Sequence, residues 1–380
     1  MSFRGKEKGP PFNLKDIFAR KDVKSVMKEL ENRCDQDMPF LLQYENVAWY
    51  EDGAVRILDR RCFPTETRFV TCRSYQEVVQ AIADMVTQST GPYTAVGMGM
   101  ALAAYECRDL PEAQQEAFLR KASDELAHSR PTAAHRYGKV TGHCLDAALK
   151  TLKEGRSTAE ACFNRTIESL NRRYSTMQIV GDHLCDLIPE GGTILTQCYG
   201  ETIIGTVTRA AKRSGKHFSA VCAETRPFFQ GARLTASCFS DMGIDTTVVS
   251  DNMIAWTMQN RGIDLFTSAC DVMTLDGYVA NKVGTFQIAI LCRHFGLPFY
   301  VTGLPDITKQ TKDDITIEMR DPEQVLSARG IRNCREAVHG LYPAFDVTPP
   351  ELITGLVTDK GVYRPGELAH YFDGGFQEYY

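Results

Sequence analysis

The chain has 380 residues, a mass of 42.5 kDa, 43% hydrophobic residues and 24% charged residues. This length favours one large domain or two ordinary ones, and the composition is that of a globular protein with a sizeable core, which excludes disordered and fibrous classes. A net charge of −5 gives no general basic field for nucleic acid, and no apolar run is long enough to span a membrane, so we expect neither partner.

The first 40 residues are predicted to be an N-terminal extension. Residues 1–13 are rich in Gly, Pro and Lys, and residues 14–32 carry apolar side chains at helical spacing. The spacing predicts an amphipathic helix over residues 14–32. Packing on its own domain and docking on a partner are both open for this helix.

A small sheet followed by helices is predicted for a domain over residues 41–175. Strands are expected at residues 47–50, 54–58 and 68–72, and the dipeptide Asp52-Gly53 is a hairpin signal between the first two. Helical periodicity then predicts helices over residues 75–86, 95–105, 112–127, 133–152 and 158–173.

Short apolar runs alternate with helical segments over residues 176–380. Strands are predicted at residues 192–196, 218–222, 246–249, 265–269 and 298–301, and helices at residues 203–213, 230–242, 253–260 and 282–294. This alternation predicts an α/β fold in which the second domain is a Rossmann-like, doubly wound parallel sheet. Ligands in such sheets bind beyond the carboxyl ends of the strands, which is where we look for function.

Two side chains at these strand ends are candidates for chemistry. Cys198 follows one strand and precedes a helix, where backbone dipoles favour a thiolate, although a cysteine at such a place can also be structural. Asp271 ends the apolar run over residues 265–270. A carboxylate that leaves a buried strand must form an ion pair, accept hydrogen bonds or shift its pKa.

Further polar residues at strand and helix ends can bind an anion. Asn281 and Lys282 open the helix expected at residue 282, where free amides and the ammonium group can hold an anion, unless this is a plain helix start. Residues 224–233 include Arg226 and Arg233, which suit sugar phosphates or a salt-bridge network between domains. Arg130 follows a helix cap and can also contact an anion.

The cysteines and histidines indicate a reducing compartment and no metal. The chain has 13 cysteines with no C-x-x-C spacing, which argues against a disulfide scaffold or a zinc ribbon. His128, His135 and His143 do not form a tight metal motif. Residues 1–11 lack the apolar core of a signal peptide, so we expect a cytoplasmic protein with mostly buried cysteines.

Several strings of the sequence resemble methylthioribose-1-phosphate isomerase. They lie at residues 224–236, 251–255, 279–285 and 343–349, and the similarity extends to the N-terminal half at 49–53, 57–60 and 129–133, so that it covers roughly residues 44–365. The same superfamily includes ribose-1,5-bisphosphate isomerase and regulatory subunits of a translation-initiation guanine-nucleotide exchange factor.

The resemblance implies an enzyme of methionine salvage that converts a furanose 1-phosphate, such as 5-methylthioribose 1-phosphate or a related 5-deoxy sugar, to the ketose. It implies a homodimer without metal or organic cofactor. By motif position Cys198 and Asp271 are its catalytic pair, with Asp271 as the acid for the ring oxygen and Cys198 in a proton transfer or beside a hydride shift. Its substrate-binding positions match four residues, namely Arg130, Gln230, Asn281 and Lys282.

The sequence also departs from the family pattern. The family grips phosphate with an arginine in an Arg-Gly-Ala-Pro stretch, but no Arg or Lys occurs between Ala83 and Ala104. The loop after Cys198 is shorter and adds Glu201, and Asp271 is followed by valine instead of arginine. The alternative prediction is therefore a non-catalytic sugar-phosphate or nucleotide-binding regulatory protein of the same superfamily.

Overall fold

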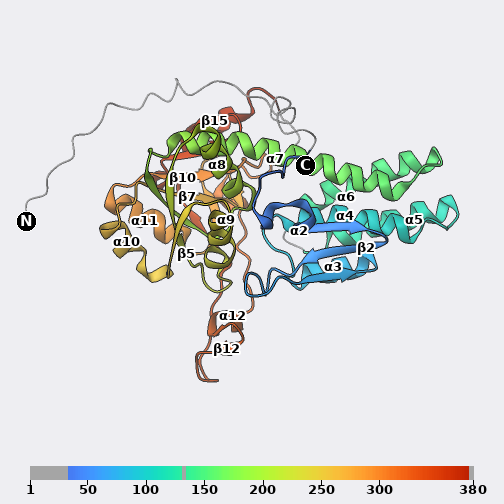
Figure 1. Cartoon of the computed structure of the whole chain (residues 1–380), viewed down its shortest axis with the longest axis horizontal. Helices are drawn as coiled ribbons and strands as arrows, with labels where there is room; N and C mark the ends of the chain where they lie inside the picture. Colours follow the sequence, from blue (N-terminus) through green and yellow to red (C-terminus); the bar gives the residue numbers. More distant parts are fainter. Residues whose placement is uncertain (1–32, 131–133, 376–380) are drawn as a thin grey trace, which may run out of the picture.

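A computed structural model of the chain describes residues 33–130 and 134–375. The helix predicted over residues 14–32 lies outside the described residues. Most of residues 33–187, the helical half, lies on one side of the molecule, and residues 188–375, the sheet half, lie on the other, with the end of α7 (Thr158–Leu187) reaching over the sheet half (Figure 1). Within the described ranges, no helix combines the length and apolar character needed to cross a membrane.

The helical half begins with a three-stranded antiparallel sheet, in which the predicted hairpin is confirmed. Five helices follow. Their central member is α4, which is buried over all but its last two residues because its small side chains let neighbours approach on every side. The elements are β1 (Ala48–Glu51), β2 (Ala54–Leu58), β3 (Phe69–Cys72), α3 (Tyr75–Ala83), α4 (Gly91–Glu106), α5 (Glu112–Ala127), α6 (Ala134–Lys153) and α7 (Thr158–Leu187).

Helix α7 is longer than predicted. Periodicity indicated an end near Arg173, but the helix continues to Leu187 and passes through residues 175 and 176, where the sequence predicted a domain boundary. Residues 173–181 are buried on all sides, polar Gln178 included, so this stretch shows no amphipathic contrast. Gly181 permits close packing on α8 (Glu201–Ser214), because a Cβ there would lie 2.7 Å from the Thr206 backbone.

The sheet half contains a seven-stranded sheet in the order β15-β14-β10-β7-β4-β5-β6, parallel except for β15. The predicted Rossmann-like α/β class and its five strands are confirmed. Periodicity did not detect β14 and β15. The strands are β4 (Gly192–Gln197), β5 (Phe218–Ala223), β6 (Asp245–Val249), β7 (Leu265–Ala269), β10 (Phe299–Thr302), β14 (Gly355–Thr358) and β15 (Gly361–Tyr363).

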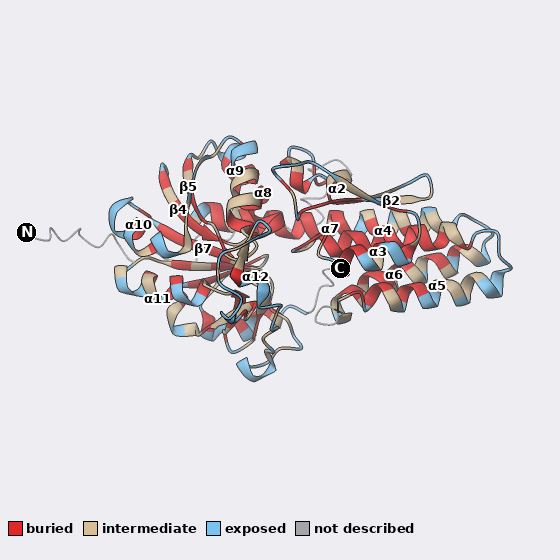
Figure 2. Ribbon diagram, turned by 90° about the horizontal axis from the view of Figure 1, so that it is seen from below, coloured by how far each residue is buried: buried red, intermediate tan, exposed pale blue. Residues whose placement is uncertain are grey.

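Helices cover both faces of this sheet, as alternate side chains of β4 show. Ile194 packs in one core with α7, α8 and α9 (Ala236–Asp241), whereas Leu195 packs in another with α10 (Ile254–Asn260) and α11 (Thr285–Phe295). Figure 2 shows the buried residues of both layers. This doubly wound arrangement leaves the carboxyl ends of the strands open to functional residues.

A second, antiparallel sheet has the order β13-β9-β8 (Phe345–Thr348, Val279–Lys282 and Val272–Met273). It corrects one prediction, because Asn281 and Lys282 end β9 instead of opening a helix. Pairing of Lys282 with Phe345 extends the strand, and α11 begins only at Thr285.

An arm, residues 321–341, projects from the sheet half (Figure 1). It carries α12 (Glu323–Leu326) and the short strands β11 (Ser327–Ala328) and β12 (Ile331–Arg332). All 13 cysteines are free thiols. Nine of them are buried, which agrees with the expectation of mostly buried cysteines.

Candidate active site

Cys198 lies directly after β4, in a left-handed backbone conformation with φ +63°. This conformation costs of order 1–3 kcal/mol for a residue other than glycine. The Cys198 backbone N–H donates to Thr225 Oγ1 at 2.8 Å, and the Thr235 hydroxyl donates to the Cys198 carbonyl. Two threonine hydroxyls therefore hold the candidate thiol in a conformation that its own backbone disfavours.

The Cys198 side chain is a thiol near neutral pH. Burial raises its pKa to about 11, against the opposing effect of the Lys282 ammonium. The sequence-based expectation that the following helix favours a thiolate is thus wrong. The loss of hydration around the sulfur outweighs the opposing effects of Lys282 and of the Tyr199 backbone N–H.

Asp271 follows β7, and its backbone N–H donates to Ala280 O of β9 at 2.9 Å. The side chain keeps solvent-accessible surface, yet protein surrounds it closely enough that desolvation raises its pKa. Lys282 opposes this rise most strongly among the cations. Asp271 is therefore an accessible carboxyl group that favours its protonated form more than an ordinary aspartate does.

Cys198, Asp271 and Lys282 act on one another electrostatically. The Asp271 carboxylate raises the pKa of Cys198, and Lys282 lowers the pKa of both groups. The three side chains come from the ends of β4 and β7 and from β9, and Cys198 is distant along the chain from the other two. The structure brings them together at one edge of the large sheet.

Lys282 and Asn281 are held by neighbours in β13 and α11. Lys282 is 3% exposed, and its Nζ donates to Ala344 O at 2.9 Å. Asn281 Nδ2 donates to Thr285 Oγ1 at 3.0 Å, and that hydroxyl donates in turn to Gln197 Oε1 at 2.9 Å. Since Gln197 directly precedes Cys198, these bonds fix the end of β9, with Asn281 and Lys282, relative to the thiol.

The start of α11 does not offer free amides to an anion. The N–H groups of Gly284 and Phe286 donate to the two carboxylate oxygens of Asp346, at 2.7 and 3.2 Å. Burial raises the pKa of Asp346 to about 6. The predicted anion site at these amides is therefore wrong, because the protein supplies its own carboxylate there.

Gln230 is buried near the end of β5. It is 7% exposed, and among the described residues its Oε1 has no hydrogen-bond partner. The adjacent Gly231 lies against Thr225, since a Cβ at Gly231 would come within 2.9 Å of the Thr225 hydroxyl. An unsatisfied carbonyl beside the threonine that holds Cys198 is suited to accept a hydrogen bond from a sugar hydroxyl.

Arg226 and Arg233 bind backbone carbonyls. Arg226 Nη2 donates to Val325 O and Ser327 O of the arm, both at 2.9 Å. The Nε, Nη1 and Nη2 atoms of Arg233 all donate to carbonyls, among them Arg60 O at 2.6 Å. These contacts fit neither a sugar-phosphate cluster nor a salt-bridge network; instead the two arginines fasten chain segments.

Arginines from the helical half reach the Asp271 side of the site. Arg130 lowers the pKa of Asp271. Arg136, on α6, donates from Nη2 to Asp271 O at 3.0 Å and to Asp306 Oδ2 at 3.4 Å. Sequence reasoning missed Arg136 because it lies just beyond the family string at residues 129–133. The available signal was a second arginine within two turns of Arg130.

The two departures from the family pattern contact each other. Glu201 and Arg60 form a fully buried ion pair at 2.7 Å, and Arg60 lowers the pKa of Glu201 despite the cost of burial. Glu201 Oε2 also accepts from the Thr90 N–H at 3.1 Å. Ser89 Oγ donates to Tyr199 O at 3.1 Å, so the segment without basic residues packs on the loop after Cys198.

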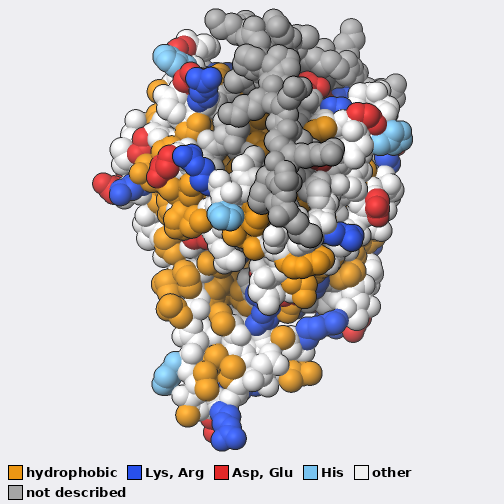
Figure 3. All heavy atoms as spheres, turned by 90° about the vertical axis from the view of Figure 1, so that its left-hand side faces the viewer, with side chains coloured by type: hydrophobic (Ala, Val, Ile, Leu, Met, Phe, Trp, Pro, Cys, Tyr) orange, Lys and Arg blue, Asp and Glu red, His pale blue; other side chains and the backbone are white. Residues whose placement is uncertain are grey.

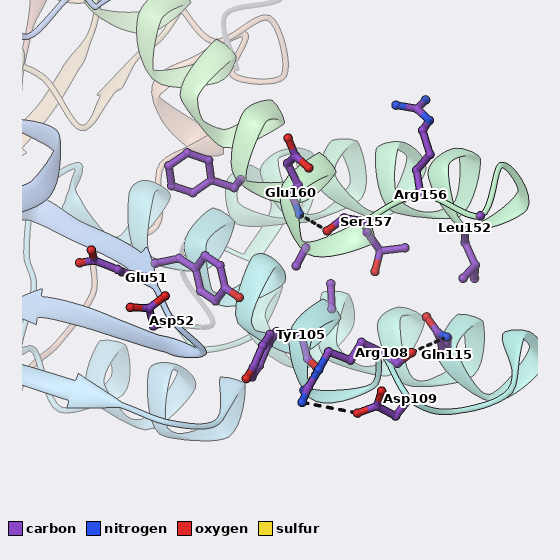
Figure 4. Close-up of a pocket in the computed structure, with 16 residues that line it drawn as sticks. Glu51, Asp52, Tyr105, Arg108, Asp109, Gln115, Leu152, Arg156, Ser157 and Glu160 are labelled. Carbon is purple, nitrogen blue, oxygen red and sulfur yellow. Dashed lines mark hydrogen bonds and ion pairs between the residues drawn. The ribbon is translucent and has the colours of Figure 1, made fainter.

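A separate pocket of about 800 Å³ lies in the helical half (Figure 4). Its lining includes Tyr105 and Arg108 at the end of α4 and Ser157 and Glu160 at the start of α7. No predicted site residue lines it. Among the residues that the structure describes, no three His, Cys, Asp or Glu side chains gather in a way that could hold a metal ion.

Similarity to known proteins covers most of the chain. It is 38% identical over 340 residues to "Methylthioribose-1-phosphate isomerase" of Desulforudis audaxviator, a match that covers 83% of this chain and 94% of that protein. A protein of the same name from Thermotoga petrophila is 34% identical over 339 residues, covering 85% of this chain and 96% of that protein. The resemblance found from the sequence motifs is confirmed.

Two solved structures are similar to the fold. The 5-methylthioribose 1-phosphate isomerase of Pyrococcus horikoshii OT3 matches with a TM-score of 0.75 and 28% identity, over 93% of this chain and 99% of that one. The translation initiation factor eIF-2B, subunit delta, of A. fulgidus matches with a TM-score of 0.75 and 29% identity, over 86% and 98%. A family model described as "Initiation factor 2 subunit family" matches residues 90–365, and the chain belongs to this family.

Proposed function

We propose that the protein is an aldose-ketose isomerase that converts 5-methylthioribose 1-phosphate, or a related 5-deoxy pentose 1-phosphate, to the ketose 1-phosphate. One observation carries the proposal. Asp271 raises the pKa of Cys198 although the two are distant in sequence, and Lys282 lowers the pKa of both, in a chain whose relatives bear the name of that enzyme. Arg130, Gln230, Asn281 and Lys282 are the proposed substrate-binding residues, and no cofactor is part of the proposal.

The proposed chemistry begins at the ring oxygen. The anomeric oxygen carries phosphate, so the ring opens only if an acid protonates the ring oxygen, and Asp271 with its raised pKa is that acid. The bond between C1 and the ring oxygen then breaks. Hydrogen moves with its electron pair from C2 to C1, and the C2 hydroxyl returns its proton to the Asp271 carboxylate, which leaves a ketone at C2.

Cys198 is proposed to contact the sugar beside C1 and C2. A route in which Cys198 removes the C2 proton as a thiolate is disfavoured, because a thiol with a pKa of about 11 is a poor base at neutral pH. The buried thiol is better suited to exclude water from the carbon atoms between which the hydride moves.

The experiment is turnover of 5-methylthioribose 1-phosphate by the purified protein, followed by phosphorus NMR. Substrate labelled with deuterium at C2 separates the routes, since a hydride shift keeps the label at C1 whereas proton transfer loses it to water. We expect ketose with retained label. Absence of ketose from this substrate and from a panel of 5-deoxy and 5-hydroxy sugar 1-phosphates would contradict the proposal.

A regulatory binding protein is the second candidate. The similarity to an eIF-2B subunit and the absence of basic residues between Ala83 and Ala104 favour it. A thermal-shift screen with sugar phosphates and nucleotides distinguishes the two candidates. A regulatory protein is stabilised by a ligand that it leaves unchanged, whereas the isomerase converts the ligand that stabilises it.

We also propose that the protein is a cytoplasmic homodimer. Its free cysteines support a reducing compartment. An apolar face formed by Met253, Trp256, Phe286 and Ile290 is exposed on α10 and α11 and the turn before α10, and Figure 3 shows hydrophobic side chains gathered on that side of the sheet half. Such a face favours association with a second copy. Sedimentation should give a dimer that Trp256→Lys dissociates.

A further inference from the structure

At the α4 end of the candidate site the Glu201 carboxylate interacts with two arginines, Arg60 and Arg173. Thr90 precedes α4, and both its N–H and its hydroxyl donate to the Glu201 carboxylate, which also pairs with Arg60. Both side chains of this ion pair have no exposed surface. A substrate phosphate at this end would compete with Glu201 for the same donors and would meet its negative charge at close range.

The opposite end, around Asp271, is positively charged. Four cationic side chains lower the pKa of Asp271, namely Lys282, Arg136, Arg320 and Arg130. Two carboxylates bind members of this group: Glu318 pairs with Arg320 at 2.9 Å, and Asp306 with Arg136 at 3.4 Å. The Asp271 end therefore concentrates cationic side chains, which suit a phosphate dianion.

Arg136 stands out in this cluster by its position. It extends from the first turn of α6 across to the sheet half, where it donates to the Asp271 carbonyl itself. Its side chain is 33% exposed, whereas Lys282 is buried and held by Ala344 O. In a furanose 1-phosphate the ring oxygen and the phosphate are both attached to C1, so a cation beside the acid for the ring oxygen is within reach of the phosphate.

We propose that Arg136 binds the phosphate of the substrate, in place of the arginine that the segment between Ala83 and Ala104 lacks. This inference rests on the proposed isomerase function and names the residue that grips its substrate. The planar guanidinium suits phosphate, and its contacts to the Asp271 carbonyl and Asp306 orient it before the substrate arrives.

The test compares Arg136→Gln with Arg165→Gln in steady-state kinetics on 5-methylthioribose 1-phosphate. Arg165 is a matched control, because it loses the same charge from α7 and its pair with Glu168 is remote from the site. We expect Arg136→Gln to raise KM about 10- to 100-fold with a smaller change in kcat, the loss of one charge-assisted contact. Arg165→Gln should leave KM within twofold.

Arg136→Lys keeps the charge but not the planar fork, so its KM should lie between the wild-type and Arg136→Gln values. Circular dichroism verifies that each variant is folded. If Arg136→Gln does not fold, the Arg136→Lys value decides alone. An unchanged KM in Arg136→Gln, or in Arg136→Lys if only that variant folds, overturns the inference. The isomerase proposal is unaffected by that result.

Calorimetric titration separates failure of the inference from failure of the proposed function. If the wild type binds 5-methylthioribose 1-phosphate without converting it, the isomerase proposal fails, yet loss of that binding in Arg136→Gln still supports a phosphate contact. Equal binding by the wild type and Arg136→Gln overturns the inference that Arg136 contacts the phosphate. A wild type that neither converts nor binds this substrate overturns both proposals.

Discussion

Two of the ion pairs between the helical half and the sheet half differ in their contact with water. In each, an arginine of the helical half meets an acid of the sheet half. Arg60–Glu201 is fully buried, whereas the side chains of Arg136 and Asp306 are 33% and 22% exposed. The first pair is enclosed by protein and also binds the Thr90 N–H, so its work is structural. The side chains of the second are partly exposed, and its arginine donates to the Asp271 carbonyl.

The difference in burial predicts a difference in energetic role. Removal of one partner of a buried pair leaves an uncompensated charge and costs about 3–5 kcal/mol, whereas an exposed pair contributes about 0–1 kcal/mol. The same chemical pairing can therefore hold the fold together in one place and remain available for ligand binding in another. Stability and catalysis should respond separately to substitutions at the two pairs.

The largest effect on catalysis is expected next to the accessible pair. Asp271→Asn removes the proposed acid and Cys198→Ser the proposed thiol, so each should lower kcat by about 10³-fold or more, with little change in melting temperature. Turnover assays and thermal denaturation measure both quantities. Near-normal rates in both variants would remove the proposed catalytic pair.

The largest effect on stability is expected at the buried pair. Glu201→Ala leaves Arg60 without its partner and should lower the free energy of unfolding by about 3–5 kcal/mol in urea denaturation. Glu201→Gln, which keeps an acceptor, should cost less. A loss below about 1 kcal/mol in the alanine variant would show that the two pairs do not differ as their burial suggests.

The pH profile should respond to Arg136 and not to the buried pair. Since the protonated Asp271 is the active form, kcat/KM should fall as pH rises through its pKa, which lies above the ordinary carboxyl value of about 4. Removing a cation disfavours the carboxylate further, so Arg136→Gln should shift this fall to higher pH.

The other ionisable groups that interact with Asp271 stay in place in that variant. Lys282, Arg130 and Arg320 lower its pKa, and Asp271 in turn raises the pKa of Cys198 and Cys270. Glu201→Gln provides the control, and its profile should match that of the wild type. A shift to lower pH in Arg136→Gln would contradict the assignment of Asp271 as the acid.

The smallest effect is expected at Asp306. Asp306→Asn removes a negative charge beside Arg136, so KM for a phosphate dianion should fall, by up to about fivefold for a partly exposed pair. The free energy of unfolding should change by less than about 1 kcal/mol. A rise in KM would mean that Asp306 orients Arg136 more than it neutralises it.

The sequence predicted the large sheet well because its strands are short apolar runs between amphipathic helices. Helix α5 and strand β7 have the predicted bounds. The prediction failed where tertiary contacts override local pattern. Residues 279–282 pair with β13, a partner more than 60 residues away, and residues 173–181 of α7 are buried on all sides.

The candidate site was predictable where chemistry follows a strand end, as at Cys198 and Asp271. The protonation state of Cys198 was not, because burial depends on packing by residues distant in sequence. The partner of Glu201 was equally hidden, since Arg60 lies 141 positions away. In the sequence, the added Glu201 and the segment without basic residues are separate changes. Only the fold shows that Glu201 contacts Thr90 of that segment.

The continuity of α7 has a mechanical consequence. Its 30 residues span about 45 Å as a single rod, packed against α4 and α6 along one part and against α8 and β14 along another. An unbroken rod resists bending between the bodies that it joins. The arginines from one body and the acids from the other are thus kept in register.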